Sequence, residues 1–516
     1  MHTSESAWDT IVLGSGIGGL SCAAALAQTG QRVLVFEQHA VAGGLTQTFN
    51  RDGFTWDVGV HYLGGMAPGE PARSMLDWLS DGRIELASLG AVYDTAHFPD
   101  GVTLEFARPE AALRLSLKER FAGADAEIDA YFEALRHAEQ ASAFVFAQRA
   151  MPELLTRFFW LWYRSGMNTW WARTSGEVMT ELVTDPRLRA VLLAQRGDYG
   201  GRPAEASFGM HATVVRSYLN GAFYPVGGAA AFAHGLVPTI QRTGGQVRTG
   251  ARVAELVAER GAVTGVRLDD GTRWHAAHVV SDAGAHNTVT RLLPAALRDS
   301  AWAQEIRSLA PSVCHVALYL GLHGDIRANG ATASNHWFHQ TWDLDALDWQ
   351  DPSGDSIAPV VFVSFGSLKD PHHRAGSSQR HTAELIVPTS WAPFARWERS
   401  TPGHRPEAYA ALKAAIARNL LAQFGRLFPA LAPMVVCHEL STPLTTAAFT
   451  GAQHGAMYGL RTSPDRFVSD SLRARTPVPG LFLAGQDVAT PGVTGAMVGG
   501  VLAAIEIEPR VLWQFR

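Results

Sequence analysis

The amino-acid sequence predicts an α/β fold with a Rossmann-like dinucleotide-binding domain and an inserted α+β second domain. Three features support this prediction: a glycine-rich turn between a strand and a helix at the N-terminus, a return to strand patterns in the middle, and a glycine-rich strand-loop-helix near the end. The chain has 516 residues, more than a single core usually accommodates, so two packed domains are expected.

The first predicted element is a β-α-β unit. Strand-like runs at 10–13 and 32–36 flank a helix of small residues over 18–29. The turn Gly14-Ser15-Gly16-Ile17-Gly18-Gly19 lies between the first strand and the helix. Its glycines permit a tight bend and let a pyrophosphate approach the free amides of the helix N-terminus.

An acidic residue completes this unit. Glu37 follows the second strand, 21 residues after Gly16, where a carboxylate can accept hydrogen bonds from a ribose diol. Together these features indicate dinucleotide binding, although the motif alone does not distinguish NAD from FAD. The alternative is a glycine turn that only packs a helix against a sheet.

The remaining elements follow in chain order. Residues 106–224 are mostly helical in pattern and rich in aromatic side chains, and strand patterns return over 250–284. Further strands are expected in a second sheet at 316–322, 360–365 and 384–387. Residues 406–428 carry an apolar stripe with the spacing of an amphipathic helix, formed by Leu412, Ile416, Leu420 and Phe424.

The C-terminal part ends the pattern with a strand at 481–485, a Gly/Pro/Thr loop and a helix from about Gly495. This order predicts a discontinuous layout. The nucleotide domain is expected to comprise residues 1–105, 225–295 and 470–516. The second domain, which would take up the substrate, is expected to comprise residues 106–224 and 296–469.

Composition excludes several classes of protein. The net charge is −5, and no block of like charges occurs, so we expect no binding to nucleic acid. Cys22, Cys314 and Cys437 are far apart and form no metal-binding spacing, so no metal site and no disulfide are expected, as in a cytoplasmic protein. Residues 1–10 are polar and show no secretory signal, and no apolar run is long enough to span a membrane.

Motifs at both ends of the chain resemble those of the FAD-containing amine oxidase and phytoene desaturase superfamily. The resemblance is carried by Gly43-Gly44, by GFTWDVGVHYLGG at 53–65 and by GLFLAGQDVATPGVTGAMVGG at 480–500. It implies an FAD domain of the two-dinucleotide-binding type, with non-covalent FAD. Beside the first glycine turn and Glu37, the resemblance assigns to the cofactor Gln38, Gly43, Gly44, Leu45, Val253, Gly485, Asp487, Val493 and Thr494.

Within this superfamily the chain is most similar to the retinol saturases and their bacterial relatives, followed by the carotenoid isomerases. This resemblance rests on WDVGVHYLGG (56–65), RGDYGGRPAEASFGMHA (196–212), YLNGAFYPVGG (218–228), STPLTTAAF (441–449), HGAMYGL (454–460) and AGQDVATPGVTGA (484–496). It implies saturation or desaturation of a C–C bond in a polyene or another long apolar molecule. Two alternatives remain open at this point: a redox-neutral cis–trans isomerase, and a non-enzymatic escort of prenyl groups.

Saturation of a polyene requires a hydride and a proton, and these motifs contain residues that can act as acids or bases. His61, Tyr62 and Tyr458 are the candidate proton donors, and Asp198-Tyr199 and His454 lie in neighbouring motifs. A cation left by protonation could be stabilised by aromatic faces. Each of these residues could equally be structural. The pair His372-His373 has the pattern of a polar loop.

Two further expectations concern partners. No second GxGxxG unit is visible, so either a separate electron donor or a redox-neutral cycle is implied. Residues 154–175 combine seven Phe, Trp and Tyr side chains with three arginines. They could form a peripheral contact with the inner face of a membrane, or they could line the core or the substrate tunnel.

Overall fold

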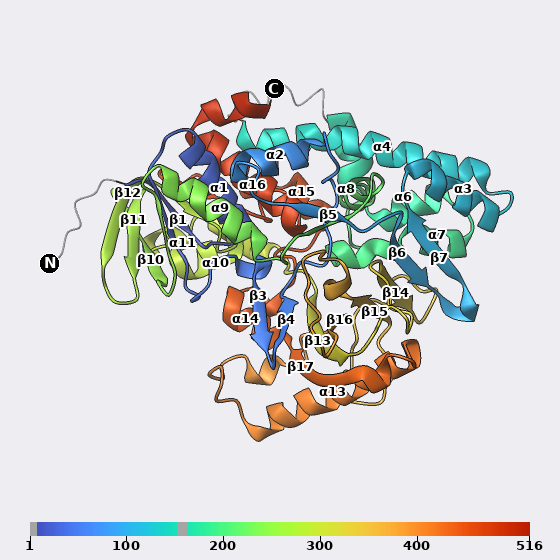
Figure 1. Ribbon diagram of the computed structural model, residues 1–516. Helices are drawn as coiled ribbons and strands as arrows, with labels where there is room; N and C mark the ends of the chain where they lie inside the picture. Colours follow the sequence, from blue (N-terminus) through green and yellow to red (C-terminus); the bar gives the residue numbers. More distant parts are fainter. Residues whose placement is uncertain (1–7, 152–163, 516) are drawn as a thin grey trace.

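The computed structural model describes residues 8–151 and 164–515. Two seven-stranded sheets dominate the architecture and lie side by side (Figure 1). The N-terminal and C-terminal segments meet in the first sheet, whereas the second sheet is built mainly from the middle of the chain. In the described part, no helix is both long and apolar enough to cross a membrane.

The first sheet has a parallel core extended by an antiparallel hairpin. Its order is β10-β11-β12-β1-β2-β9, and β18 pairs with β12 on the other side of that strand. Strands β18, β12, β1, β2 and β9 run parallel, in the Rossmann-like manner. The strands are β1 (Trp8–Leu13), β2 (Val33–Phe36), β9 (Gln246–Arg248), β10 (Val253–Glu259), β11 (Ala262–Leu268), β12 (Arg273–Ser281) and β18 (Leu481–Leu483).

Helices of small residues pack closely beside this sheet. They are α1 (Ile17–Gln28), α9 (Ala231–Arg242) and α16 (Gly492–Ile507). Glycine permits the close contact between α1 and α16, because a Cβ atom at Gly500 would collide with the carbonyl oxygen of Gly18. The two ends of the chain are therefore fixed against each other.

The second sheet is mostly antiparallel. Its order is β17-β13-β16-β15-β14-β6-β7, and only β14 and β6 are paired in parallel. The strands are β6 (Val92–His97), β7 (Thr103–Ala107), β13 (Cys314–His323), β14 (Asn335–His339), β15 (Val360–Ser364), β16 (Arg380–Thr389) and β17 (Val435–Ser441).

Alternation along the strands gives this sheet two different faces. Leu318 and Leu385 pair across β13 and β16 and pack towards α13 (Glu407–Leu427), the helix beneath the sheet in Figure 1. Phe362 and Trp337 belong instead to the core shared with the helical region. This region comprises α3 (Glu110–Arg120), α4 (Asp125–Ala147), α6 (Ser175–Leu182), α7 (Pro186–Leu192) and α8 (Phe208–Tyr218).

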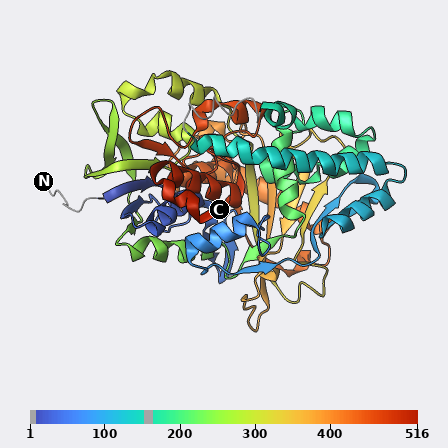
Figure 2. The same cartoon turned by 90° about the horizontal axis from the view of Figure 1, so that it is seen from above.

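Helix α4 links the two halves. From above, it extends from beside the C-terminal helices across the second half (Figure 2). Shorter elements fill the junction between the halves. They are β3 (Thr48–Arg51), β4 (Phe54–Asp57), α2 (Pro71–Ser80), β5 (Leu86–Ser88), β8 (Phe223–Pro225), α10 (Ala285–Asn287), α11 (Ala295–Arg298), α12 (Ala301–Ser308), α14 (Pro443–Thr450) and α15 (Pro464–Val468).

The structure differs from the sequence prediction in two details. The chain enters the second sheet at β6 and β7, although residues up to 105 were expected in the nucleotide domain. These strands follow hydrophobic patterns that do not reveal which sheet they join, because strand pairing is a long-range property. The last helix begins at Gly492 rather than near Gly495, since Pro491 precedes it and suits a helix start.

Candidate active site

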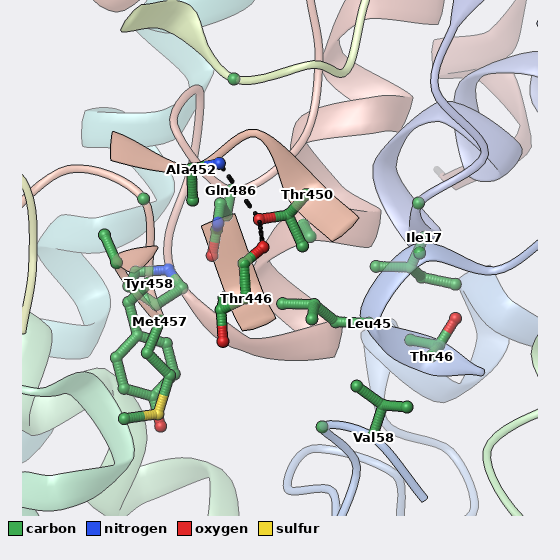
Figure 3. A pocket seen from close by; sticks show the side chains of 18 of the residues that line it. Ile17, Leu45, Thr46, Val58, Thr446, Thr450, Ala452, Met457, Tyr458 and Gln486 are labelled. Atoms are coloured by element: carbon green, nitrogen blue, oxygen red, sulfur yellow. Dashed lines mark hydrogen bonds between the residues drawn. The ribbon is translucent and has the colours of Figure 1, made fainter. Parts of the chain in front are cut away.

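One large cavity lies at the junction of the two sheets. Its volume is about 1140 Å³, and its lining includes residues of the first glycine turn, of the C-terminal loop and of the second sheet. Figure 3 shows Ile17 and Leu45 on one side of this space and Met457 and Tyr458 across it. The cavity thus joins the predicted nucleotide site to the second domain.

The nucleotide half is shaped by glycines that leave no room for side chains. Gly14 has a φ of +94°, a conformation that favours glycine. A Cβ atom at Gly16 would lie 2.6 Å from Asp282 Oδ2, and one at Gly18 would lie 2.6 Å from Asp282 Oδ1. The missing side chains therefore let the turn pack against the Asp282 carboxyl group, and Gly14, Gly16 and Gly18 themselves line the cavity, where a pyrophosphate could approach their backbone.

Glu37 is held by donors from the same turn. Its Oε2 accepts hydrogen bonds from the Ser15 amide at 2.9 Å and the Ser15 hydroxyl at 2.7 Å. Its Oε1 accepts one from the His39 amide at 2.7 Å. The carboxylate is only 7% exposed and lines the cavity. It is fixed where a ribose hydroxyl can reach its remaining lone pairs.

Asp282 lies at the centre of this half, and the sequence analysis did not identify it. It follows β12, and its carboxyl group is packed among the glycines of both loops. Burial raises its pKa to about 7, the Gly19 amide opposes the shift, and the charges of Glu37 and Asp487 add to it. Its position in the sequence could have indicated this role, because Asp282 directly follows a central parallel strand and the ends of such strands face the ligand crevice.

The C-terminal loop is tied to the rest of the site by Asp487 and Thr494. Asp487 Oδ2 accepts a hydrogen bond from the Ala285 amide at 2.9 Å, and Oδ1 accepts one from the Leu460 amide at 3.1 Å. The Thr494 hydroxyl donates to the Gly64 carbonyl at 3.3 Å. The Asp487 bonds hold the loop against Ala285 and Leu460, and the Thr494 bond connects it to the segment after β4.

Twelve of the fifteen predicted cofactor residues line the cavity. The other three, Gly19, Gly43 and Gly485, lie next to it: Gly43 donates to the Ser15 carbonyl, and Gly18 and Gly485 approach each other closely. The twelve lining residues are Gly14, Gly16, Ile17, Gly18, Glu37, Gln38, Gly44, Leu45, Val253, Asp487, Val493 and Thr494.

Several residues of the cavity lining carry buried polar atoms without a protein partner. His39 Nδ1, His286 Nδ1, Asn287 Oδ1 and His315 Nδ1 belong to lining residues, and none has a hydrogen-bond partner among the described residues. Such atoms cost free energy unless a ligand or water satisfies them. Polar lining residues of this kind and the backbone of Gly14, Gly16 and Gly18 fit a large polar cofactor in the cavity.

The other half of the cavity has an aromatic wall. Tyr62 and Tyr218 are stacked with ring centroids 4.5 Å apart, and Trp337 and Phe362 are 4.6 Å apart. All four rings line the cavity, together with Tyr458. Flat apolar faces of this kind suit a long conjugated molecule and can stabilise positive charge on it.

His61 and Tyr62, two of the predicted proton donors, lie side by side in this half but have different partners. His61 Nδ1 is 3.0 Å from Oε2 of the buried Glu384, a partner that fixes the orientation of the ring. The Tyr62 hydroxyl is 2.6 Å from Asp198 Oδ2 and 3.0 Å from Asp94 Oδ2. The sequence analysis missed Glu384 and Asp94, which come from β16 and β6.

A buried lysine lies behind these groups. Lys369 Nζ donates to the His61 carbonyl and the Ser364 hydroxyl, both at 2.7 Å, and to the Asn335 side-chain oxygen. Burial lowers its pKa to about 8, an effect opposed by four surrounding carboxylates, first Glu384 and then Asp94, Asp57 and Asp198. This lysine offsets part of the negative charge that the carboxylates bring into the interior.

Tyr458, the third predicted donor, lies on the cavity wall with a single partner. Its hydroxyl donates to the Gly197 carbonyl at 3.2 Å. Burial, with a smaller contribution from the charge of Asp198, holds its pKa well above the ordinary value for tyrosine. Tyr458 therefore holds its proton firmly and positions the turn that carries Asp198.

The aromatic segment 154–175 lies partly outside the described residues, which resume at residue 164. In the described part, Trp171 is completely buried, and its ring nitrogen donates to the Ala138 carbonyl of α4. Trp170 packs against Phe208 with ring centroids 5.7 Å apart. Trp171 therefore belongs to the interior of the helical region, whereas Trp170 is half-buried at its edge and Arg164 is exposed.

Comparisons with known proteins agree with this geometry. The chain is 32% identical to human all-trans-retinol 13,14-reductase, with 98% of this chain and 86% of the relative covered. It is 26% identical to a chloroplastic prolycopene isomerase of Arabidopsis thaliana, covering 97% and 82% of the two chains. A solved oxidoreductase from Methanosarcina mazei superposes with a TM-score of 0.64 at 16% identity, over 95% of this chain and 98% of the other.

The solved structure supports the predicted fold, an α/β architecture with a Rossmann-like domain. The sequence model of the flavin containing amine oxidoreductases matches residues 17–507, almost the entire described chain. That match begins within the glycine turn, at Ile17, and includes Gly18, Gly19, Glu37 and the C-terminal loop. The chain therefore belongs to the flavin-containing amine oxidoreductase family and is a flavin-dependent oxidoreductase.

Proposed function

We propose that this enzyme binds FAD without a covalent bond and reduces one C=C bond of a conjugated isoprenoid, in the manner of a retinol reductase. One observation carries the proposal: a single cavity joins the glycine-lined nucleotide half to the aromatic wall. The similarity to retinol 13,14-reductases supports the same substrate class.

The residues of the nucleotide half favour FAD over a smaller flavin. Glu37 suits an adenosine ribose, and Val493 and Thr494 line the same cavity from the C-terminal loop, where Thr494 bonds to Gly64. Non-covalent binding is supported by the sequence of the cofactor segments, because neither the turn at 43–45 nor the loop 484–496 contains a cysteine or a histidine, the side chains that form covalent bonds to flavin. Denaturation is expected to release all the flavin as free FAD.

The roles of the chain's own residues follow from the geometry. When bound and reduced, FAD supplies a hydride. The stacked rings of Tyr62 and Tyr218 would hold the polyene flat, and their faces would stabilise positive charge that develops on it. The Glu384 carboxylate would keep His61 in one orientation at the cavity wall. The apolar lining would exclude water from the reacting bond.

Product mass tests the proposal. The purified holoprotein would be reduced without oxygen and incubated separately with all-trans-retinol and with prolycopene. A product heavier by two hydrogens supports the reductase. A product of unchanged mass but altered geometry would support the isomerase, which the similarity to prolycopene isomerases favours as second candidate. Recovery of both compounds unchanged would contradict both functions.

The electron source is a separate part of the proposal. The chain offers one glycine-rich dinucleotide turn, and the residues around it fit FAD, so we propose that a second protein or a small donor reduces the flavin. NADPH added to the isolated holoprotein should leave the flavin absorbance unchanged, whereas a chemical reductant should bleach it. Rapid bleaching by NADPH alone would contradict a separate donor.

A further inference from the structure

Three oxygen-bearing side chains from different parts of the chain meet at the aromatic wall. Tyr62 follows β4, Asp94 lies within β6, and Asp198 lies in the turn Ala194–Tyr199. The Tyr62 hydroxyl is within hydrogen-bond distance of both carboxyl groups. Asp94 is completely buried, whereas Asp198 is partly exposed to the cavity. The three groups therefore form a short chain from the interior to the cavity.

The hydrogen bonds among these three side chains determine how many protons the group holds. Two contacts join three oxygens, and the tyrosine supplies only one proton, so one carboxyl group must supply another. Asp94 already accepts from the side-chain amides of Gln195 at 2.7 Å and Asn335 at 3.0 Å, which favours its ionised form. Asp198 has Tyr62 as its side-chain hydrogen-bond partner among the described residues. The second proton therefore belongs to Asp198.

The surrounding charges agree with this assignment. Burial, and next the charge of Asp94, hold the pKa of Asp198 well above its usual range; the Tyr62 hydroxyl and Lys369 act in the opposite direction. Burial raises the pKa of Tyr62 as well, so the phenol remains neutral. The titratable side chains around Asp198 are Tyr62, Tyr93, Asp94, Tyr199, Tyr218, Lys369 and Tyr458.

From this arrangement we infer that Asp198 is the acid that delivers a proton to the substrate, with Tyr62 and Asp94 as positioning residues that keep it protonated. The inference rests on the proposed function and adds the proton donor to it. Of the three, Asp94 is not part of the cavity lining, and burial holds the pKa of Tyr62 well above its usual range, so its phenol keeps its proton. Asp198 combines a carboxylic proton with a place on the cavity wall.

Reduction of one C=C bond needs a proton and a hydride, which come from Asp198 and from the reduced flavin. The electrons of one C=C bond form a new C–H bond with the Asp198 proton, while the Oδ–H bond breaks and leaves a carboxylate. The neighbouring carbon receives the hydride, with its electron pair, from the reduced flavin of the proposed function. After the product leaves, the carboxylate takes up a proton from water that enters the cavity. A general acid of this kind contributes roughly 10²–10⁴-fold to the rate.

The first test measures the protonation state directly and requires no turnover. A protonated carboxyl group buried in protein absorbs in the infrared apart from carboxylates, and its band shifts in D₂O. The infrared difference spectrum between the flavin-loaded wild type and Asp198→Asn should contain this band near neutral pH, and the subtraction removes the band of Asp282, whose pKa is raised to about 7. A difference spectrum without a protonated-carboxyl band would overturn the assignment of the proton to Asp198.

The second test measures the chemical step. The rate at which all-trans-retinol reoxidises the anaerobically reduced holoprotein should fall roughly 10²–10⁴-fold in Asp198→Asn. Asparagine preserves the shape of the protonated acid and can still donate to Tyr62, but it has no proton to give. Asp198→Glu should recover part of the rate. Tyr62→Phe should lower the rate less and should move the alkaline limb of the pH profile, because it alters the environment of Asp198.

Tyr131→Phe is the matched control for Tyr62→Phe, because it removes a buried tyrosine hydroxyl elsewhere in the same core. Tyr131 is a buried tyrosine of the same core whose hydroxyl is 2.9 Å from His211 Nε2 and 3.2 Å from the Leu192 carbonyl, away from the cavity lining. It should leave the rate unchanged. A wild-type rate in Asp198→Asn with full flavin content would overturn the inference and leave the proposed function standing. If the wild type yields no reduced product, the proposed function fails, and the infrared band still decides whether Asp198 carries the proton.

Discussion

The two halves of the cavity are built in different ways. The nucleotide half comes largely from short contiguous segments, the turn Gly14–Gly19 and the loop 484–496, whose backbone faces the cavity. The aromatic half is assembled from single side chains such as Tyr62, Asp94 and Asp198, which are far apart in the sequence. Backbone geometry shapes the first half, and long-range packing shapes the second.

This difference separates their functions. A backbone cradle depends on the absence of side chains, so it tolerates few changes and recognises a cofactor that is common to many enzymes. Side chains carried by a separate sheet and helices can change without disturbing that cradle. Changes in the nucleotide half should therefore alter flavin binding and stability, and changes in the aromatic half should alter turnover with the flavin retained.

The largest effect on stability is expected from Asp282→Asn. The pKa of Asp282 is raised to about 7 in the folded protein, mainly by burial, against 3.8 for an ordinary aspartate. The native state therefore binds the proton more tightly than the unfolded chain, and its stability falls as the pH rises through this range. Each pKa unit corresponds to about 1.4 kcal/mol, so up to about 4 kcal/mol is lost by pH 8.

Asparagine cannot ionise and should remove this loss. The free energy of unfolding, measured from pH 5 to pH 8 with saturating FAD, should decline less steeply in Asp282→Asn than in the wild type. Asp270→Asn is the control, because Asp270 lies in an exposed turn with a lowered pKa. Equal slopes for the wild type and Asp282→Asn would show that Asp282 does not titrate between pH 5 and pH 8 in the folded protein.

These residues also show how far the sequence alone could predict the site. Gly14, Gly16 and Glu37 were predicted because a phosphate cradle has a fixed spacing in a single β-α-β unit. Asp94, Lys369 and Glu384 could not be predicted in the same way. They come together only when β6, β16 and the turn after β15 join the second sheet. The same limit applies to β6 and β7, whose sheet is decided by pairing with β14.

A smaller effect, confined to the cofactor, is expected from Glu37→Ala. The change leaves the Ser15 amide and hydroxyl without their acceptor and removes the group that faces the ribose. A loss of about 1–3 kcal/mol in binding is expected, roughly a 5- to 150-fold weaker affinity for FAD. Gel filtration should strip flavin from this variant, while Glu259→Ala, at the exposed end of β10, should retain it. Full retention of FAD by Glu37→Ala would contradict the assignment of Glu37 to the adenosine ribose.

The smallest effect is expected from Tyr458→Phe, in the aromatic half. The change removes the hydrogen bond to the Gly197 carbonyl, at 3.2 Å, and a bond of this kind contributes about 0.5–1.5 kcal/mol. The ring itself remains, packed against Gly200, so flavin content should not change. Because the phenol only supports the turn that carries Asp198, polyene reduction should slow by less than about tenfold.

Tyr458 was a candidate proton donor from the sequence, and the same variant decides between that role and a supporting one. Loss of a true donor would cost roughly 10²–10⁴-fold in rate, well beyond the loss of one neutral hydrogen bond. Single-turnover rates for Tyr458→Phe and Asp198→Asn, measured on the same flavin-loaded preparations, should therefore differ by at least an order of magnitude. Equal and large losses in both variants would place the proton on Tyr458 as well, and the acid of the aromatic half would then be a pair joined through Gly197 rather than a single aspartate.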